Sequence, residues 1–180
     1  MAKIITAAEA ADLIRDGMTL GVSGFGAFAS PDYVMEAMSR KFKEQNTPRD
    51  LTIVSGVAPG DFVEDGCGLS KIKDAGIIKT LIASHLRMSP AIGRACSENK
   101  IAAFSMPLGV YGQLLNAIGS KRPGIITHVG LNTYADPRQD GCKMNELAKA
   151  DGREMVELIH VSGKDYLFYK AFHIDACILH

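Results

Sequence analysis

The sequence predicts an α/β fold: an open, mainly parallel sheet with flanking helices, followed by a C-terminal hairpin. Short apolar runs that are typical of buried strands alternate with amphipathic stretches of helical periodicity. Strands that are connected through helices form right-handed crossovers, and such crossovers build a parallel sheet. Near the C-terminus, two strand-like runs instead flank Ser162-Gly163-Lys164-Asp165, which indicates a hairpin.

Length and composition indicate a single folded domain over residues 1–180. Apolar residues make up 47% of the 180 residues, which is enough for a hydrophobic core. The formal net charge is zero, which argues against a broad surface for nucleic acid or an anionic membrane. No apolar run approaches the roughly 18 residues of a transmembrane helix. We therefore expect neither nucleic acid nor membrane as a partner.

The cysteines and the N-terminus indicate a cytoplasmic protein. Cys67, Cys96, Cys142 and Cys177 are far apart and form no Cys-x-x-Cys pair, so we expect reduced thiols and no metal site. The N-terminal stretch MAKIITAAEA lacks the apolar run of a secretory signal.

Helix starts can be read from capping residues. Thr6 and Glu9 have the spacing of a capping box. Ser30-Pro31 predicts a helix start with Ser30 as the cap, and Ser89-Pro90 repeats this chemistry. Further helical stretches are expected at 69–75 and 108–118. In the helix after Pro31, the side chains expected to face inward are Val34, Met35, Met38 and Phe42.

Strands are expected at 18–23, 51–55, 77–84, 101–105, 125–129 and 174–179, and the first and last of these are of the buried type. The chain stops within the last of these runs, so we expect the domain to be truncated at its C-terminal end. Ligands of open α/β sheets bind at the carboxyl ends of the strands. By that rule the functional loops are GFGAFAS, GVAPG, HLRMSP, MPLG and NTYADPR.

The loop SGFGAFASPD, residues 23–32, has two explanations. It is either a tight turn before a helix or a place where a ligand approaches the backbone, since amides near a helix start attract negative charge. The pattern is no GxGxxG dinucleotide motif, and no Gly-Lys-Ser/Thr follows, which excludes a P-loop.

The loop GVAPGDFVEDG, residues 56–66, also has two explanations. It is either a plain connection from strand to helix or a source of free backbone donors. In the second case, the amides of Gly56 and Val57 are candidates for an oxyanion hole.

Isolated polar residues point first to structural roles. His85 ends a strand-like run and fits a packed or capping residue, while Asp136 and Arg138 fit a turn held by an ion pair. No group of His, Cys, Asp and Glu has metal-ligand spacing, so no metal is expected. From the residues alone, the chain is a cytosolic α/β domain that binds a small acidic or acyl ligand, with no assigned reaction.

Taken together, the motifs resemble the N-terminal, alpha-like half of a family I coenzyme A transferase. SGFGAFASPDYVMEAM, TPRDLTIVS, the stretch from GIIKTLIASHLRMSP to ENKIAAF, KRPGIITHVGLNTYADPRQDGCKMNE and YLFYKA follow the family's order. The likeness covers nearly all of the chain. Within the family, the sequence most resembles the branch of acetate, propionate and short-chain 3-oxoacid CoA-transferases. These enzymes act in the metabolism of acetate, ketone bodies and short-chain fatty acids. The fold implied is the CoA-transferase and sugar-phosphate isomerase-like fold.

The resemblance implies a ping-pong reaction. A glutamate attacks an acyl-CoA thioester, and coenzyme A is then carried as a glutamyl-CoA thioester to an acceptor carboxylic acid. Gly56 and Val57 would supply the N-terminal oxyanion donors, and no cofactor would be bound permanently. The substrate-binding residues that we expect are Gly24, Phe25, Gly26, Ser55, Pro107, Leu108, Gly109 and Asn132.

Two departures from the family pattern carry consequences. The nucleophilic glutamate lies in a Glu-x-Gly setting in the family's C-terminal half, so this chain holds no catalytic residue. Glu64-Asp65-Gly66 mimics the motif in the wrong half. The family's Pro-Gln-Gly appears as Pro107-Leu108-Gly109, and the loss of the glutamine amide favours a more apolar acyl group.

The partners implied are an acyl-CoA, a short-chain carboxylate, a C-terminal half or beta-type subunit, and further copies in a homo-oligomer. The 180 residues alone are expected to be inactive. Two other functions remain open. One is a ligand-sensing or regulatory domain of the sugar-phosphate isomerase-like fold, for which only Arg87 and Arg138 supply basic residues in the strand-end loops. The other is a non-catalytic scaffold.

Overall fold

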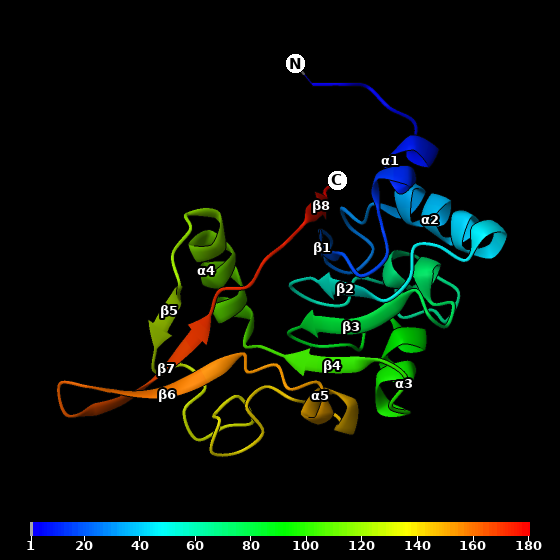
Figure 1. The fold of residues 1–180 in the computed structure, drawn as a ribbon. Coiled ribbons are helices and arrows are strands. Elements are labelled where there is room, and N and C mark those ends of the chain that lie inside the picture. The colour runs from blue at the N-terminus through cyan, green and yellow to red at the C-terminus, as the bar shows by residue number, and fades with distance from the viewer. Residues whose placement is uncertain (1) are drawn as a thin grey trace.

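Five parallel strands form the larger of two sheets in the computed structural model, which describes residues 2–180 (Figure 1). Its order is β4-β3-β2-β1-β8, and every neighbouring pair is parallel. The strands are β1 (Thr19–Val22), β2 (Leu51–Val54), β3 (Ile78–Ala83), β4 (Ala102–Ser105) and β8 (Ala176–Ile178). The predicted α/β class with a mainly parallel sheet is therefore confirmed.

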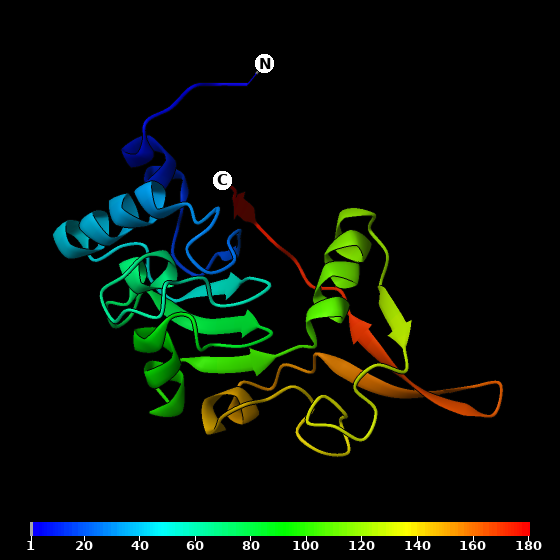
Figure 2. The same cartoon turned by 180° about the vertical axis from the view of Figure 1, so that it is seen from behind.

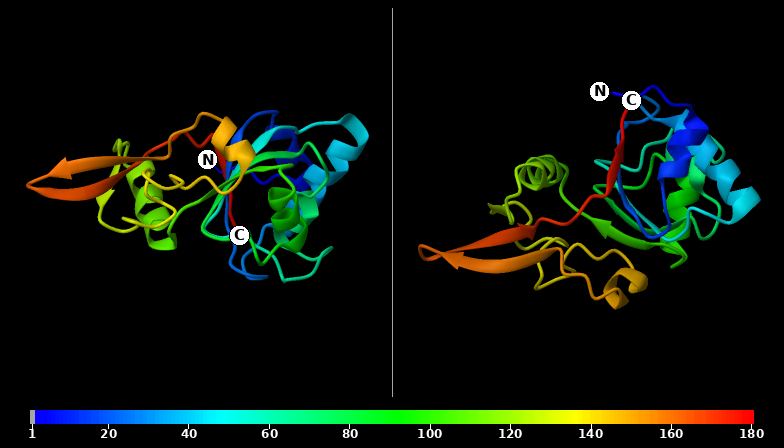
Figure 3. Two further views of the ribbon diagram at one scale, coloured as in Figure 1. Left: turned by 90° about the horizontal axis from the view of Figure 1, so that it is seen from below. Right: turned by 45° about the horizontal axis from the view of Figure 1, so that its top comes forward.

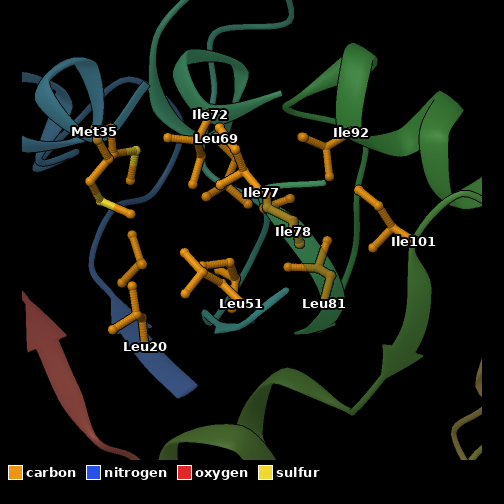
Figure 4. Close-up of a cluster of buried hydrophobic side chains, with 14 of the residues drawn as sticks. Leu20, Met35, Leu51, Leu69, Ile72, Ile77, Ile78, Leu81, Ile92 and Ile101 are labelled. Atoms are coloured by element: carbon orange, nitrogen blue, oxygen red, sulfur yellow. The ribbon is translucent and has the colours of Figure 1, made fainter. Parts of the chain in front are cut away.

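Helices cover one face of this sheet. They are α1 (Ala7–Leu13), α2 (Asp32–Gln45), the 3-10 helix η1 (Gly68–Ile72) and α3 (Pro90–Ser97). Figure 4 shows their apolar side chains, such as Met35, Leu69 and Ile92, meeting Leu20, Leu51 and Leu81 of the strands. None of the helices within residues 2–180 has the length and apolar character needed to cross a membrane.

The capping predictions were partly right. Thr6 and Glu9 form both hydrogen bonds of a capping box, and Met35 and Met38 are buried as expected. The prediction for Ser30 was wrong, because the N-cap position falls one residue later, on Pro31, and the buried Ser30 hydroxyl has no hydrogen-bond partner within residues 2–180. Ser89 does occupy the N-cap position of α3, but its hydroxyl pairs with Ser70 at 3.1 Å.

The opposite face of the sheet packs against a second layer. This layer holds α4 (Leu108–Gly119) and a three-stranded antiparallel sheet of order β5-β7-β6, as Figures 2 and 3 show. Its strands are β5 (Gly124–Thr127), β6 (Val156–Val161) and β7 (Lys164–Lys170). β6 and β7 form the predicted hairpin around Ser162-Gly163. The strand expected at 125–129 exists, but it pairs with β7 instead of joining the parallel sheet.

The chain then returns to the large sheet to add its last strand. Residues 171–175 cross from β7 to β8, which pairs with β1. The Thr19 amide donates to the Asp175 carboxylate at 2.8 Å, and the Asp175 amide donates to the Thr19 carbonyl at 2.9 Å. These two hydrogen bonds fix the position at which the chain enters β8.

A buried carboxylate organises the long loop between β5 and α5 (Glu146–Ala150). Asp136 is fully buried and accepts hydrogen bonds from the amides of Asn132 and Arg138 at 2.9 and 3.0 Å. The Arg138 guanidinium adds bonds at 2.7 and 3.0 Å and also reaches Asp165 of the hairpin at 3.1 Å. These guanidinium bonds, followed by the two amides, hold the pKa of Asp136 well below its usual value. The turn held by an ion pair is thus confirmed.

Asp136→Asn should lower the free energy of unfolding by about 2 to 3 kcal/mol, because the charge of a buried carboxylate that accepts four partly buried hydrogen bonds is lost. Asp165→Asn, which breaks an exposed bond to the same arginine, should cost less than about 1 kcal/mol. Urea titration of the 180-residue chain measures both.

The difference between wild type and Asp136→Asn should also depend on pH. The folded-state pKa of Asp136 is lowered, so its stabilisation is complete above the unfolded value of about 4 and is lost as pH falls below it. The two proteins should therefore converge in stability under acid conditions. A constant difference down to pH 3 would contradict this account.

Candidate active site

The carboxyl ends of β1, β2, β3 and β4 bring four of the five expected loops to one edge of the parallel sheet. The arrowheads of β2, β3 and β4 point the same way in Figure 1. The fifth loop, NTYADPR, follows β5 of the antiparallel sheet, so the strand-end rule did not apply to it.

The glycines of the loop after β1 serve both a turn and a close approach. Phe25 and Phe28 exchange backbone hydrogen bonds of 3.0 and 3.1 Å across a tight turn in which Gly26 has a φ of +61°. Gly24 has a φ of +126°, and a Cβ there would lie 2.9 Å from the Pro59 side chain. The absence of a side chain at Gly24 thus lets the neighbouring loop, which carries Pro59, come close to it.

Three strand-end loops are tied together by backbone groups. The Gly60 amide donates to the Gly26 carbonyl at 3.1 Å, and the Phe62 amide donates to the Met88 carbonyl at 2.9 Å. The Gly26 amide lies 3.2 Å from the Met88 sulfur. A Cβ on Gly60 would come within 2.2 Å of the Met88 carbonyl oxygen, so this contact requires glycine. The edge of the sheet is therefore preorganised.

The amides of Gly56 and Val57 are free of acceptors within residues 2–180. The chain bends away from β2 here, and the Gly56 carbonyl points toward β3, where it accepts from the Ser84 amide at 3.0 Å. The Ser84 hydroxyl donates to the same oxygen. Ser55 is fully buried, and its hydroxyl donates to the Val22 carbonyl at 2.9 Å, so it fastens β2 to β1. Two free donors beside a fixed carbonyl are suited to stabilise an oxyanion.

An apolar wall stands over Gly56. A Cβ built there would lie 3.5 Å from Leu108 and 3.5 Å from Tyr111, both on α4. Pro107 occupies the N-cap position of that helix, while Gly109 has open space around it. Leu108 is half-exposed, and burial raises the pKa of the Tyr111 phenol to about 12, which keeps it neutral. Leu108 and Gly56 are thus brought together.

Asn132 lies apart from the other candidates. Its amide bonds to Asp136, and its side-chain oxygen lies 3.5 Å from the Arg138 guanidinium. No hydrogen bond in the described part of the chain links it to the loops after β1 or β2. It belongs to the loop organised by Asp136.

Glu64 also lies away from the free amides. It forms an ion pair with Arg94 and lines a groove of 680 Å³ with Ile78 and Ile101, at the amino ends of β3 and β4. Its surroundings are those of a surface ion pair. Across residues 2–180, no three side chains of His, Cys, Asp and Glu come together as a metal site.

The sequence reasoning missed Ser84, Ser105 and Tyr111. Ser84 and Ser105 follow or end apolar strands, and a polar residue at that position was the available signal. His85 was weighed and given a packing role. Its Nδ1 is buried without a partner in the described residues, while its carbonyl accepts from the Ala58 amide at 3.0 Å.

Comparison with known proteins places this geometry in a family. The family model described as Coenzyme A transferase matches residues 4–180. The chain is 41% identical over 179 residues to "Caffeate CoA-transferase" of Acetobacterium woodii, covering 99% of this chain and 33% of that protein. It is 36% identical over 177 residues to "Acetate CoA-transferase YdiF" of Escherichia coli K12, covering 98% of this chain and 32% of that protein.

Comparison with solved structures supports the same family. The apoenzyme of the acyl-CoA transferase YdiF from Escherichia coli O157:H7 superimposes with a TM-score of 0.91 at 35% identity, over 98% of this chain and 33% of that one. Its thioester complex with CoA gives a TM-score of 0.90 at 35% identity, over 97% of this chain and 33% of that one. The chain spans about a third of the length of these relatives. By sequence and by fold, it belongs to the coenzyme A transferase family.

Proposed function

We propose that this chain is the N-terminal part of a CoA-transferase that moves coenzyme A between an acyl-CoA and a short-chain carboxylic acid. The observation that carries the proposal is the pair of free amides at Gly56 and Val57, held at a preorganised strand edge in this family's fold. Relatives named for acetate and caffeate transfer support it.

The chemistry proposed is covalent and proceeds through a glutamate outside residues 1–180. Its carboxylate attacks the thioester carbonyl, and the oxygen that gains negative charge accepts hydrogen bonds from the Gly56 and Val57 amides. Collapse expels the CoA thiolate and leaves a mixed anhydride, which the thiolate attacks at the glutamyl carbonyl to release the carboxylate and form glutamyl-CoA. The acceptor acid then reverses these steps. CoA is the substrate, and a related structure holds it as a thioester.

The wall above Gly56 favours an apolar acyl group. Leu108 and Tyr111 both lie against this glycine, and neither offers a charged group to a substrate. The phenol of Tyr111 stays neutral because burial raises its pKa to about 12. We therefore expect acids with a larger apolar tail to be better acceptors than acetate.

The partner proposed is a C-terminal half or a beta-type subunit, within a cytoplasmic homo-oligomer. Large apolar side chains stay exposed at the strand edge and beside it: Phe25, Phe28, Leu108 and Leu179. A second unit would cover them and bring the glutamate to Gly56. A phosphosugar-sensing function has less support, because Arg138 is engaged by Asp136.

Borohydride trapping tests the reaction. Treatment of the intact protein that contains this chain with an acyl-CoA, followed by borohydride, should reduce one glutamyl thioester to an alcohol and abolish transfer. Peptide mapping should find the residue that lost an oxygen and gained two hydrogens outside residues 1–180. Borohydride without acyl-CoA is the control. Trapping at Glu64, or no trapping at all, would refute the mechanism.

Gly56→Ala separates folding from function. The new methyl would make ordinary contacts of 3.5 Å, so the free energy of unfolding should change by less than about 1 kcal/mol. It would occupy the space beneath Leu108, beside the oxyanion donors, so kcat/KM should fall by about tenfold or more.

Gly112→Ala is the matched control, because nothing lies within 4 Å of a Cβ there and the residue sits inside α4. It should gain about 0.5 to 1 kcal/mol of stability at unchanged kcat/KM. Full activity of Gly56→Ala would place the acyl site elsewhere.

The exposed apolar edge predicts self-association of the 180-residue chain. Light scattering over a concentration series should show a mass that rises with concentration. Phe28→Ser should reduce this rise, whereas Ile4→Ser, a change in the exposed N-terminal segment, should not. A monomer at every concentration would contradict the expectation.

A further inference from the structure

The geometry points to Ser84 as a positioning residue that aims the Val57 amide at the reacting oxygen. The inference rests on the proposed function, in which that amide stabilises an oxyanion. Ser84 itself touches no reacting atom in this arrangement. It acts on the other end of the same peptide group, at the Gly56 carbonyl.

The direction of the Val57 N–H follows from the Gly56 carbonyl. In a trans peptide the carbonyl oxygen and the amide hydrogen point in opposite directions. The bond between Gly56 and Val57 is trans, because the only cis peptide in residues 2–180 is Thr47–Pro48. The carbonyl points to Ser84 of the neighbouring strand end, so the N–H points away from it and stays free.

Two donors from one residue hold this carbonyl. The Ser84 amide donates at 3.0 Å, and the Ser84 hydroxyl donates to the same oxygen. Together they occupy both lone pairs of the oxygen, which resists rotation of the peptide plane. They also polarise the amide group, and a polarised amide is a stronger donor at its N–H end. The free amide is thus both aimed and strengthened.

Two further hydroxyl groups, those of Ser105 and Tyr134, hold the backbone of Ser84 in place. The Ser105 hydroxyl donates to the Ser84 carbonyl at 2.9 Å. The Ser105 hydroxyl also lies 3.3 Å from the Tyr134 phenol oxygen. Ser84, Ser105 and Tyr134 line a pocket of 350 Å³. This support fixes the backbone from which both Ser84 donors extend.

The hydroxyl is separable from the fold. Without it, the Ser84 amide still bonds to Gly56, the Ala58 amide still bonds to His85 at 3.0 Å, and the Met106 amide still bonds to Ala83 at 3.2 Å. The strand ends therefore stay joined in a Ser84→Ala variant. What changes is the number of donors on the Gly56 carbonyl, from two to one.

Steady-state kinetics of the intact protein that contains this chain give the first test. Ser84→Ala should lower kcat and kcat/KM about tenfold with KM within twofold, since the loss falls on an interaction made in the transition state. Ser84→Thr keeps the hydroxyl and should restore most of kcat. Ser97→Ala is the matched control, because it removes a serine bond to a backbone carbonyl on the exposed side of α3 and should leave kcat unchanged. A rise in KM at constant kcat, or an unchanged kcat in Ser84→Ala, would overturn the inference.

The second test reads the amide directly in the intact protein that contains this chain, perdeuterated and labelled with ¹⁵N-valine. The Val57 ¹H–¹⁵N resonance should move in Ser84→Ala and return in Ser84→Thr, while Ser97→Ala leaves it in place. An unmoved Val57 resonance would overturn the inference even if activity fell. This test also separates the two proposals. If the wild-type intact protein transfers no coenzyme A, the proposed function fails, whereas a Val57 resonance that follows Ser84 supports the orientation independently.

Discussion

The backbone register of the parallel sheet is the constraint on which the rest of the structure depends. Leu20, Ile53, Leu81 and Ala103 form one row across β1 to β4, and Ala176 extends it into β8. This row places the strand ends at the same height. The loops can then bond to one another through Gly26, Gly60 and Met88, and the bend at Gly56 can leave two amides free beside a carbonyl held by its neighbour.

Local sequence predicted where strands and helices form better than it predicted which strands pair with one another. The apolar runs of β1 to β4 were readable because strands buried on both faces show no polar alternation. The run at 125–129 was equally readable as a strand, yet its pairing with β7 depends on residues 40 positions away in sequence, such as Leu167 opposite Thr127. Ser30 failed as a cap because a shift of one residue, which no local pattern records, moves the N-cap to Pro31.

The same distinction applies to the site. The glycines after β1 and β2 were visible in the sequence, but Gly24 is explained by Pro59 of another loop. Gly56 and Val57 remain the oxyanion candidates, and Leu108 does lie over Gly56. The role of Ser84 could not be foreseen, because it depends on a carbonyl that turns toward β3 only after the chain leaves β2. Asn132, in turn, has its backbone held by Asp136.

The pairing of β8 with β1 has a consequence for the order of folding. Leu20 pairs with Ala176, and the bond from the Thr19 amide to Asp175 spans 156 residues. During synthesis from the N-terminus, β1 can pair with β2 early, but its other edge stays open until residues 176–178 have been made. An open edge can pair with other chains, and contacts this distant form slowly. Within residues 2–180, the sheet is therefore completed last at its β8 edge, and β1 stays unpaired on that side until β8 has formed.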